Sequence, residues 1–117
     1  LPVFVLINPT LHSWTIENLV KNAIDAMKGK GNLDLVIEQE GDSVKIKVSD
    51  TGNGILKSHF KKIFEPGFTT KKRGWGLGLS LTKRIVEEYH KGFIKVVQSE
   101  IGKGSTIQLS YKKSESI

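Results

Sequence analysis

The apolar residues change their spacing from a helical period to an alternating one, and this order constrains the fold more than any other feature. Asn8 and Pro9 supply an N-cap and a pre-organised first helical residue. Seven apolar residues then recur at helical spacing: Leu11, Ile16, Leu19, Val20, Ala23, Ile24 and Met27. Two alternating segments, 33–37 and 44–48, follow on either side of Gly41-Asp42. We therefore expect a helix over about 9–27 and then a β-hairpin.

The rest of the chain predicts a second helix and two closing strands. A short helix is expected at 56–64, an irregular segment at 65–74, and a long helix over about 76–90 with the apolar stripe Leu81, Ile85, Val86 and Tyr89. Strands are expected at 93–99 and 105–112, and a short one at 1–7. The sum is an α+β domain in two layers, with helices on one face of a mixed, mostly antiparallel sheet.

Composition limits the kind of protein. The chain has 117 residues, enough for one hydrophobic core, and no cysteine, which excludes disulfides and thiolate metal sites. Its longest apolar run, 3–7, is far shorter than the roughly 20 residues that span a bilayer. The sequence opens at Leu1, and we interpret it as part of a longer, cytoplasmic chain, which leaves open whether the parent protein is membrane-anchored. The domain is expected over 1–112, with a disordered tail over 113–117.

The positive charge is concentrated in one quarter of the chain. The net charge is +6, and residues 57–84 hold eight basic residues and a single acidic one. The same quarter contains a cluster of glycines, which favours a polyphosphate ligand over nucleic acid.

Asp50 stands at the end of the second alternating segment, with the same parity as Val44, Ile46 and Val48. Its carboxylate should therefore point toward the core side, where it needs a donor. One interpretation is that it caps the turn that follows. The other is that Gly52 and Gly54 let a flat ligand approach, and that an exocyclic amine such as that of adenine satisfies the acid.

Asn18 and Asn22 lie one turn apart on the first helix, beside its apolar stripe. Asparagine is a mediocre helix former, so a stacked pair suggests a function. An amide oxygen is a hard ligand that suits Mg²⁺, which takes its other ligands from water and phosphate.

Gly74-Trp75-Gly76-Leu77-Gly78 opens the second long helix. Glycines before a helix N-terminus expose backbone N–H groups to an anion, as in a phosphate-binding loop. The run is neither a P-loop nor a dinucleotide-binding fingerprint, because the required residues and spacing are missing.

Taken in order, these motifs resemble the catalytic ATP-binding domain of sensor histidine kinases, in the GHKL superfamily with gyrase, Hsp90 and MutL. The resemblance extends from about Leu11 to Leu109. Residues 17–23 are similar to the N box, those from Asp50 to the G1 box, 64–71 to the F box and 74–78 to the G2 box. It implies the Bergerat α/β sandwich, an ATP lid at about 65–75, and ATP and Mg²⁺ as cofactors.

The resemblance also implies roles for individual residues. Asn22 would bind Mg²⁺ and act in catalysis together with the lid cations Lys71 and Arg73. The nucleotide would be held by Asn18, Asn22, Asp50, Gly52, Gly54, Phe64, Thr69, Thr70, Lys71, Lys72, Arg73, Gly74, Gly76, Leu77, Gly78 and Thr106.

One position separates the subfamilies. The ATPases of the superfamily carry a Glu four residues before the Mg²⁺-binding Asn, as general base; here that residue is Asn18. The resemblance therefore implies a phosphotransferase whose acceptor histidine lies on a separate helical dimerisation domain, absent from this sequence, in a homodimeric parent kinase with a downstream response regulator. None of His12, His59 and His90 precedes an acidic residue, as the acceptor does in the family. A non-catalytic nucleotide-sensing module is the alternative.

Overall fold

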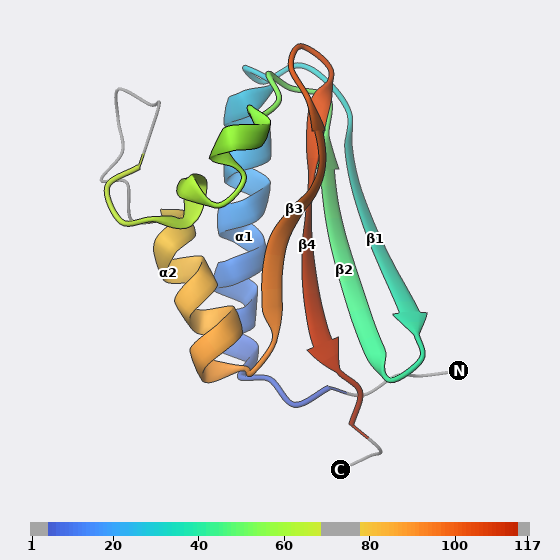
Figure 1. Ribbon diagram of the computed structural model, residues 1–117. Helices are drawn as coiled ribbons and strands as arrows, with labels where there is room; N and C mark the ends of the chain where they lie inside the picture. The colour runs from blue at the N-terminus through green and yellow to red at the C-terminus, as the bar shows by residue number, and fades with distance from the viewer. Residues whose placement is uncertain (1–4, 69–77, 115–117) are drawn as a thin grey trace.

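The computed structural model describes residues 5–68 and 78–114, which form two layers. One layer is a four-stranded sheet; the other contains the helices, all on one face of that sheet (Figure 1). The elements are α1 (Pro9–Ala26), β1 (Leu33–Glu40), β2 (Ser43–Asp50), the 3₁₀ turns η1 (Lys57–His59) and η2 (Lys62–Phe64), α2 (Gly78–Arg84), the π-helical turn η3 (Ile85–Tyr89), β3 (Phe93–Glu100) and β4 (Gly104–Lys112). The predicted α+β sandwich is confirmed.

Local sequence signals set the ends of α1. The Asn8 side chain accepts a hydrogen bond of 3.1 Å from the Leu11 N–H, and Pro9 occupies the first turn. The helix ends where Lys28 and Gly29 adopt positive φ angles. Thr15, Leu19 and Ala23 are its buried residues, and they define the face that packs on the sheet.

The sheet has the strand order β1-β2-β4-β3, and every ladder among the described strands is antiparallel. The mostly antiparallel character expected of the sheet is therefore confirmed, and no parallel pair occurs among the described strands. The predicted hairpin is confirmed, with its turn at residues 41–42. Because β1 lies at the edge, beyond the cover of α1, its inward-parity residues Leu35 and Ile37 remain 50% and 72% exposed.

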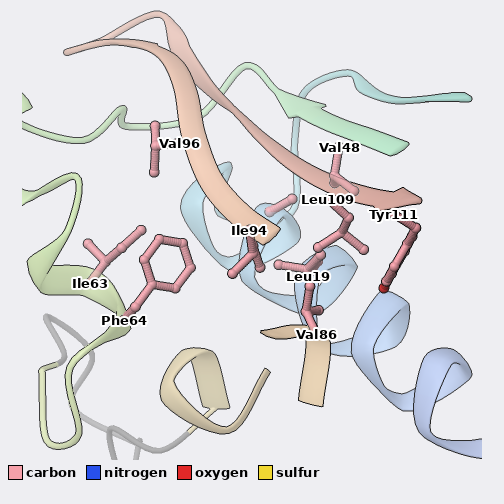
Figure 2. Packing of buried hydrophobic residues seen from close by; sticks show 10 residues of the cluster. Leu19, Val48, Ile63, Phe64, Val86, Ile94, Val96, Leu109 and Tyr111 are labelled. Carbon is pink, nitrogen blue, oxygen red and sulfur yellow. The ribbon is translucent and has the colours of Figure 1, made fainter. Parts of the chain in front are cut away.

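The core lies between strands β2, β4 and β3 on one side and the helices on the other (Figure 2). Leu19, Val86 and Leu109, from α1, η3 and β4, have at most 2% of their surface exposed. Ile63 and Phe64 close the core from the side of η2 (Figure 2). Burial of such side chains stabilises the fold by roughly 1.5–3 kcal/mol each.

Two of the short expected elements differ from the structure. Residues 5–7 of the expected first strand are irregular, and residues 1–4 lie outside the described ranges. The expected helix at 56–64 is two separate 3₁₀ turns, neither of which has a side-chain cap.

The second helix is described from Gly78 onward, and its last turn is wider than expected. It begins at Gly78, residues 76 and 77 being outside the described ranges, and the His90 N–H bonds to the Ile85 carbonyl five residues back. This wider turn rotates the end of the helix. Ile85 and Val86 are buried as expected, whereas Tyr89 and Leu81 are 60% and 41% exposed.

No helix within the described ranges is both long enough and apolar enough to cross a bilayer. The expected disordered tail falls mainly on residues 115–117, outside those ranges. Lys113, at its start, donates its backbone N–H to the Asp42 carbonyl at 2.6 Å.

Candidate functional site

Asp50 ends β2 and turns the chain toward α1. One of its carboxylate oxygens, Oδ1, accepts a hydrogen bond of 2.9 Å from the Gly52 N–H, so the turn-capping interpretation holds. The strand register pairs Asp50 with Ser105, on the same face as Val44 and Val48. That face carries the helices. A carboxylate in this position retains acceptor capacity beyond its bond to Gly52, since each carboxylate oxygen can accept two hydrogen bonds.

Gly52 docks this turn onto the C-terminal end of α1. A Cβ on Gly52 would lie 2.6 Å from the Ala26 backbone carbonyl, a distance that real Cβ atoms do not adopt. The next residue, Asn53, donates its N–H to that same carbonyl at 3.1 Å. Glycine is therefore required for close approach, not for an unusual φ angle.

The two asparagines belong to one stripe of α1. Asn18, Asn22 and Ala26 are four residues apart, so they follow one another along one side of the helix over roughly 12 Å. Ala26 contacts the turn that follows Asp50, and Asn18 contacts α2. The stripe thus runs from the turn that follows Asp50 to α2, and the half-buried Asn22 lies between these two ends.

At the α2 end, Asn18 is held by a buried hydroxyl. Its Nδ2 donates to Thr82 Oγ1 at 2.7 Å, and Thr82 Oγ1 donates to the Gly78 carbonyl at 2.7 Å. A Cβ on Gly78 would lie 3.1 Å from Asn18 Oδ1. The N-box and G2-box residues therefore meet directly at Asn18 and Gly78.

Gly54 and two serines anchor the other side of the Asp50 turn. Gly54 has φ +79°, and a Cβ there would collide with the backbone of Glu100 and Ile101. The next N–H, that of Ile55, donates to Ser99 Oγ at 2.6 Å, and Ser99 Oγ lies 2.8 Å from Ser105 Oγ. Ser99 reaches this position because the β3–β4 register shifts between Val96 and Gln98.

Sequence reasoning missed Thr82, Ser99 and Ser105. Thr82 could have been noticed from its spacing, one helical turn after Gly78. The serines could not, because no signal in the sequence marks the bulge that turns Ser99 inward.

Two predicted binding residues lie elsewhere. Thr106 pairs with Ser49, and their hydroxyls are 2.8 Å apart on the sheet face opposite Asp50. Ser105, not Thr106, is the strand partner of Asp50, because alternate residues of a strand face opposite ways. Phe64 is only 7% exposed and packs in the core with Ile63, and its contact with the nucleotide stays a prediction.

Most of the predicted lid and most of the second glycine motif fall outside the described residues: Thr69, Thr70, Lys71, Lys72, Arg73, Gly74, Gly76 and Leu77. At the boundary, Phe68 is half-buried, packs against the core and contacts the His59 ring edge-on at 5.3 Å.

A histidine cluster lies at the other end of α1. His90 Nε2 accepts a hydrogen bond of 2.9 Å from the Asn8 N–H, and Tyr111 Oη lies 3.4 Å from His12 Nδ1. Burial lowers the pKa of His12, and the nearby His90 lowers it further; burial also lowers the pKa of His90. Burial raises the pKa of the Tyr111 hydroxyl to about 12. These groups are therefore neutral at pH 7.

The fold and the site together define a class. An antiparallel sheet covered on one face by helices, with an acid–glycine turn docked on an asparagine-bearing helix, is the arrangement expected of the catalytic domains named above. The sequence profile described as histidine kinase-, DNA gyrase B- and HSP90-like ATPase matches residues 10–115. The chain belongs to this family.

The relatives are sensor kinases. The chain is 46% identical over 102 residues to the sensor histidine kinase ZraS of Escherichia coli K12, covering 87% of this chain and 22% of ZraS. It is 41% identical over 96 residues to sporulation kinase A of Bacillus subtilis, covering 82% of this chain and 16% of that kinase. The chain thus spans about a fifth of the length of the curated relatives it matches.

Solved structures agree with the fold. The catalytic domain of histidine kinase ThkA, in a nucleotide-free form, superposes with a TM-score of 0.81 at 32% identity, covering 92% of this chain and 71% of that domain. ThkA in complex with the response regulator protein TrrA superposes with a TM-score of 0.79 at 31% identity, covering 94% of this chain and 30% of ThkA.

Proposed function

We propose that this domain binds Mg²⁺–ATP and transfers the γ-phosphoryl group to a histidine on a helical dimerisation domain of the parent kinase. Its membership of the family and its similarity to ZraS and sporulation kinase A support this function. The observation that carries the proposal is the docking of the Asp50 turn on α1 through Gly52 and Ala26. This contact brings an acceptor for the adenine amine to one end of a stripe whose other members are Asn22 and Asn18.

The donor set on α1 fits magnesium. Within the described residues no group of three or more histidine or carboxylate side chains could form an all-protein metal cage. Amide oxygens are suitable hard ligands when phosphate and water supply the remaining positions. Asn22 would hold the ion, which when bound neutralises charge on the phosphates.

Most of the catalysis in such a transfer is positioning and electrostatic stabilisation, so this chain's task is to orient the nucleotide. Asp50 accepts the adenine amine, and Gly52 and Gly54 hold the Asp50 turn against α1 and against the end of β3. Lys71 and Arg73 of the lid offset charge on the transferred group. Asn18 cannot accept a proton at neutral pH, so it does not activate water, and phosphate is retained for the acceptor histidine.

The partners follow from the same proposal. The acceptor histidine must come from outside this sequence, because none of its three histidines precedes an acidic residue. Phe68, at the edge of the lid, contributes to docking of the helical domain. A response regulator then receives the phosphoryl group, as the complex of ThkA with TrrA suggests. We place the domain in the cytoplasm, in a homodimeric parent.

Asp50→Asn tests the proposal. The Asn oxygen can keep the bond to the Gly52 N–H, while the second carboxylate oxygen is replaced by an amide that cannot accept from adenine. We expect calorimetry to show at least a tenfold loss of affinity for Mg²⁺–ATP, since a hydrogen bond to a charged group contributes about 1.5–3 kcal/mol.

Asp42→Asn is the matched control, because Asp42 is exposed at the β1–β2 turn, away from the site. It should leave affinity unchanged. Equal affinity of the Asp50→Asn variant and the unaltered chain would refute the assignment. Phosphohistidine formation, when the helical domain of the parent is supplied with ATP and this chain, tests the transfer itself.

A further inference from the structure

The hydroxyl of Thr82 has no role in the function proposed so far, although it is fully buried. Thr82 is 0% exposed, and its side chain lies between α1 and α2. A buried hydroxyl that made only the common bond to the carbonyl four residues back would be a local feature of α2. Thr82 instead joins that carbonyl to an asparagine 64 residues earlier in the sequence.

The single proton of the hydroxyl determines the direction of both bonds. The Gly78 carbonyl can only accept, so the Thr82 O–H donates to it at 2.7 Å. The same oxygen must therefore accept at its second contact, 2.7 Å from Asn18. Only the NH₂ end of the amide can donate, so this end faces Thr82 and the carbonyl end faces away from it.

The amide of Asn18 lies at the first described residue of α2. A Cβ built on Gly78 would lie 3.1 Å from Oδ1 and 3.2 Å from Nδ2, so the whole amide rests where any other residue at position 78 would place its side chain. Among the described residues no donor to Oδ1 is recorded. An oxygen oriented in this way, one turn from Asn22 and beside the last glycine of the 74–78 run, is a hard ligand for Mg²⁺ or its coordinated water.

We propose that Thr82 is a positioning residue for nucleotide binding: it holds the Asn18 amide with its oxygen toward the magnesium triphosphate. This inference rests on the proposed function. Without the hydroxyl, the amide could rotate and present NH₂ instead of oxygen. The loss would affect the phosphate end of the ligand, whereas adenine recognition at Asp50 would be unchanged.

The test compares two ligands and two backgrounds. In Thr82→Val, which keeps the shape of the side chain, we expect affinity for Mg²⁺–AMPPNP to fall about three- to tenfold, the range for one net hydrogen bond. Adenosine affinity, measured by NMR titration, should stay within twofold. Thr82→Ser should restore the Mg²⁺–AMPPNP affinity, which a purely packing role of the γ-methyl group would not allow.

The Asn18→Ala background separates positioning from general stability. If Thr82 acts through Asn18, Thr82→Val causes no further loss of affinity once Asn18 is alanine. An equal loss in both backgrounds, or a Thr82→Val variant that binds Mg²⁺–AMPPNP like the unaltered chain, would overturn the proposal. Failure of the unaltered chain to bind, or insensitivity to Asp50→Asn, would instead refute the proposed function.

Gly78→Ala tests the same geometry without valine at position 82. Its Cβ would force the Asn18 amide to shift by a few tenths of an ångström, and alanine has a higher helix propensity than glycine, so we expect the variant to fold. We expect the same selective loss of Mg²⁺–AMPPNP affinity. Unchanged affinity for Mg²⁺–AMPPNP in this variant would also overturn the proposal.

Discussion

The hydroxyl of Ser99 accepts the Ile55 backbone N–H at 2.6 Å and thereby ties the segment after Asp50 to β3. The same oxygen lies 3.1 Å from the Gly104 carbonyl and 2.8 Å from Ser105 Oγ. One side chain thus connects the acid–glycine turn, β3 and the β3–β4 turn, all at one end of the sheet (Figure 1).

Ser99→Ala should destabilise this end of the domain. It leaves the part-buried Ile55 N–H without its acceptor, which costs about 1–3 kcal/mol. We expect a corresponding decrease in the free energy of unfolding, measured with urea, and weaker nucleotide binding. Ser58→Ala, at an exposed position on η1, is the control. A decrease no larger than that of Ser58→Ala would show that the bond contributes nothing.

Gly52→Ala should destabilise the domain, because there is no room for the added Cβ. Its Cβ would be placed 2.6 Å from the Ala26 carbonyl, and backbone cannot yield as a flexible side chain can. We expect about 1–3 kcal/mol of destabilisation in urea unfolding, as for other over-packed sites.

Asn53→Ala changes the adjacent, exposed residue and keeps both backbone hydrogen bonds of residue 53. It should therefore lower the free energy of unfolding far less than Gly52→Ala does. If Gly52→Ala were as stable as Asn53→Ala, the docking of the turn on α1 would be wrong.

Leu109→Ala tests the core. Leu109 is 0% exposed and lies among Leu19, Val86 and Ile94. Its truncation should lower the free energy of unfolding by about 2–5 kcal/mol, the range for a buried leucine that leaves a cavity. Ile101→Ala is the control, because Ile101 is 58% exposed in the β3–β4 turn. It should lower the free energy of unfolding by under about 1 kcal/mol. Similar losses at the two positions would contradict the packing in Figure 2.

Stability should depend on pH through the histidine cluster. His12 and His90 have lowered pKa values in the folded protein, so the unfolded chain binds more protons than the folded one in the window below the ordinary histidine pKa of about 6.5. The free energy of unfolding should therefore fall as pH decreases through that window. Protonation also converts His90 Nε2 into a donor that faces the Asn8 N–H.

His90→Gln should flatten this dependence, because glutamine can still accept from Asn8 but does not titrate. The measurement is urea unfolding at several pH values between 5 and 8. His59→Gln removes a histidine outside the cluster and is the control. The same change of slope in both variants would show that the cluster does not cause the pH dependence.

The sequence predicted α1 closely, because its N-cap, its proline and its apolar period all act within a few residues of chain. The β1–β2 hairpin and the closing strands were predicted for the same reason. The acid–glycine turn and the asparagine pair were recognised from residue type and spacing. Those signals describe which chemistry is present, and they do not state which side chains come together.

Contacts over long sequence separation were decided by the tertiary structure alone. The register of β2 against β4 placed Ser105, and not Thr106, beside Asp50, because a shift of one residue reverses the face of a strand. Packing against η2 buried Phe64. The bulge in β3 turned Ser99 inward, and the approach of α2 to α1 gave Asn18 its partner in Thr82. Local sequence determines the elements, whereas the orientation of each functional side chain depends on which distant element packs against it.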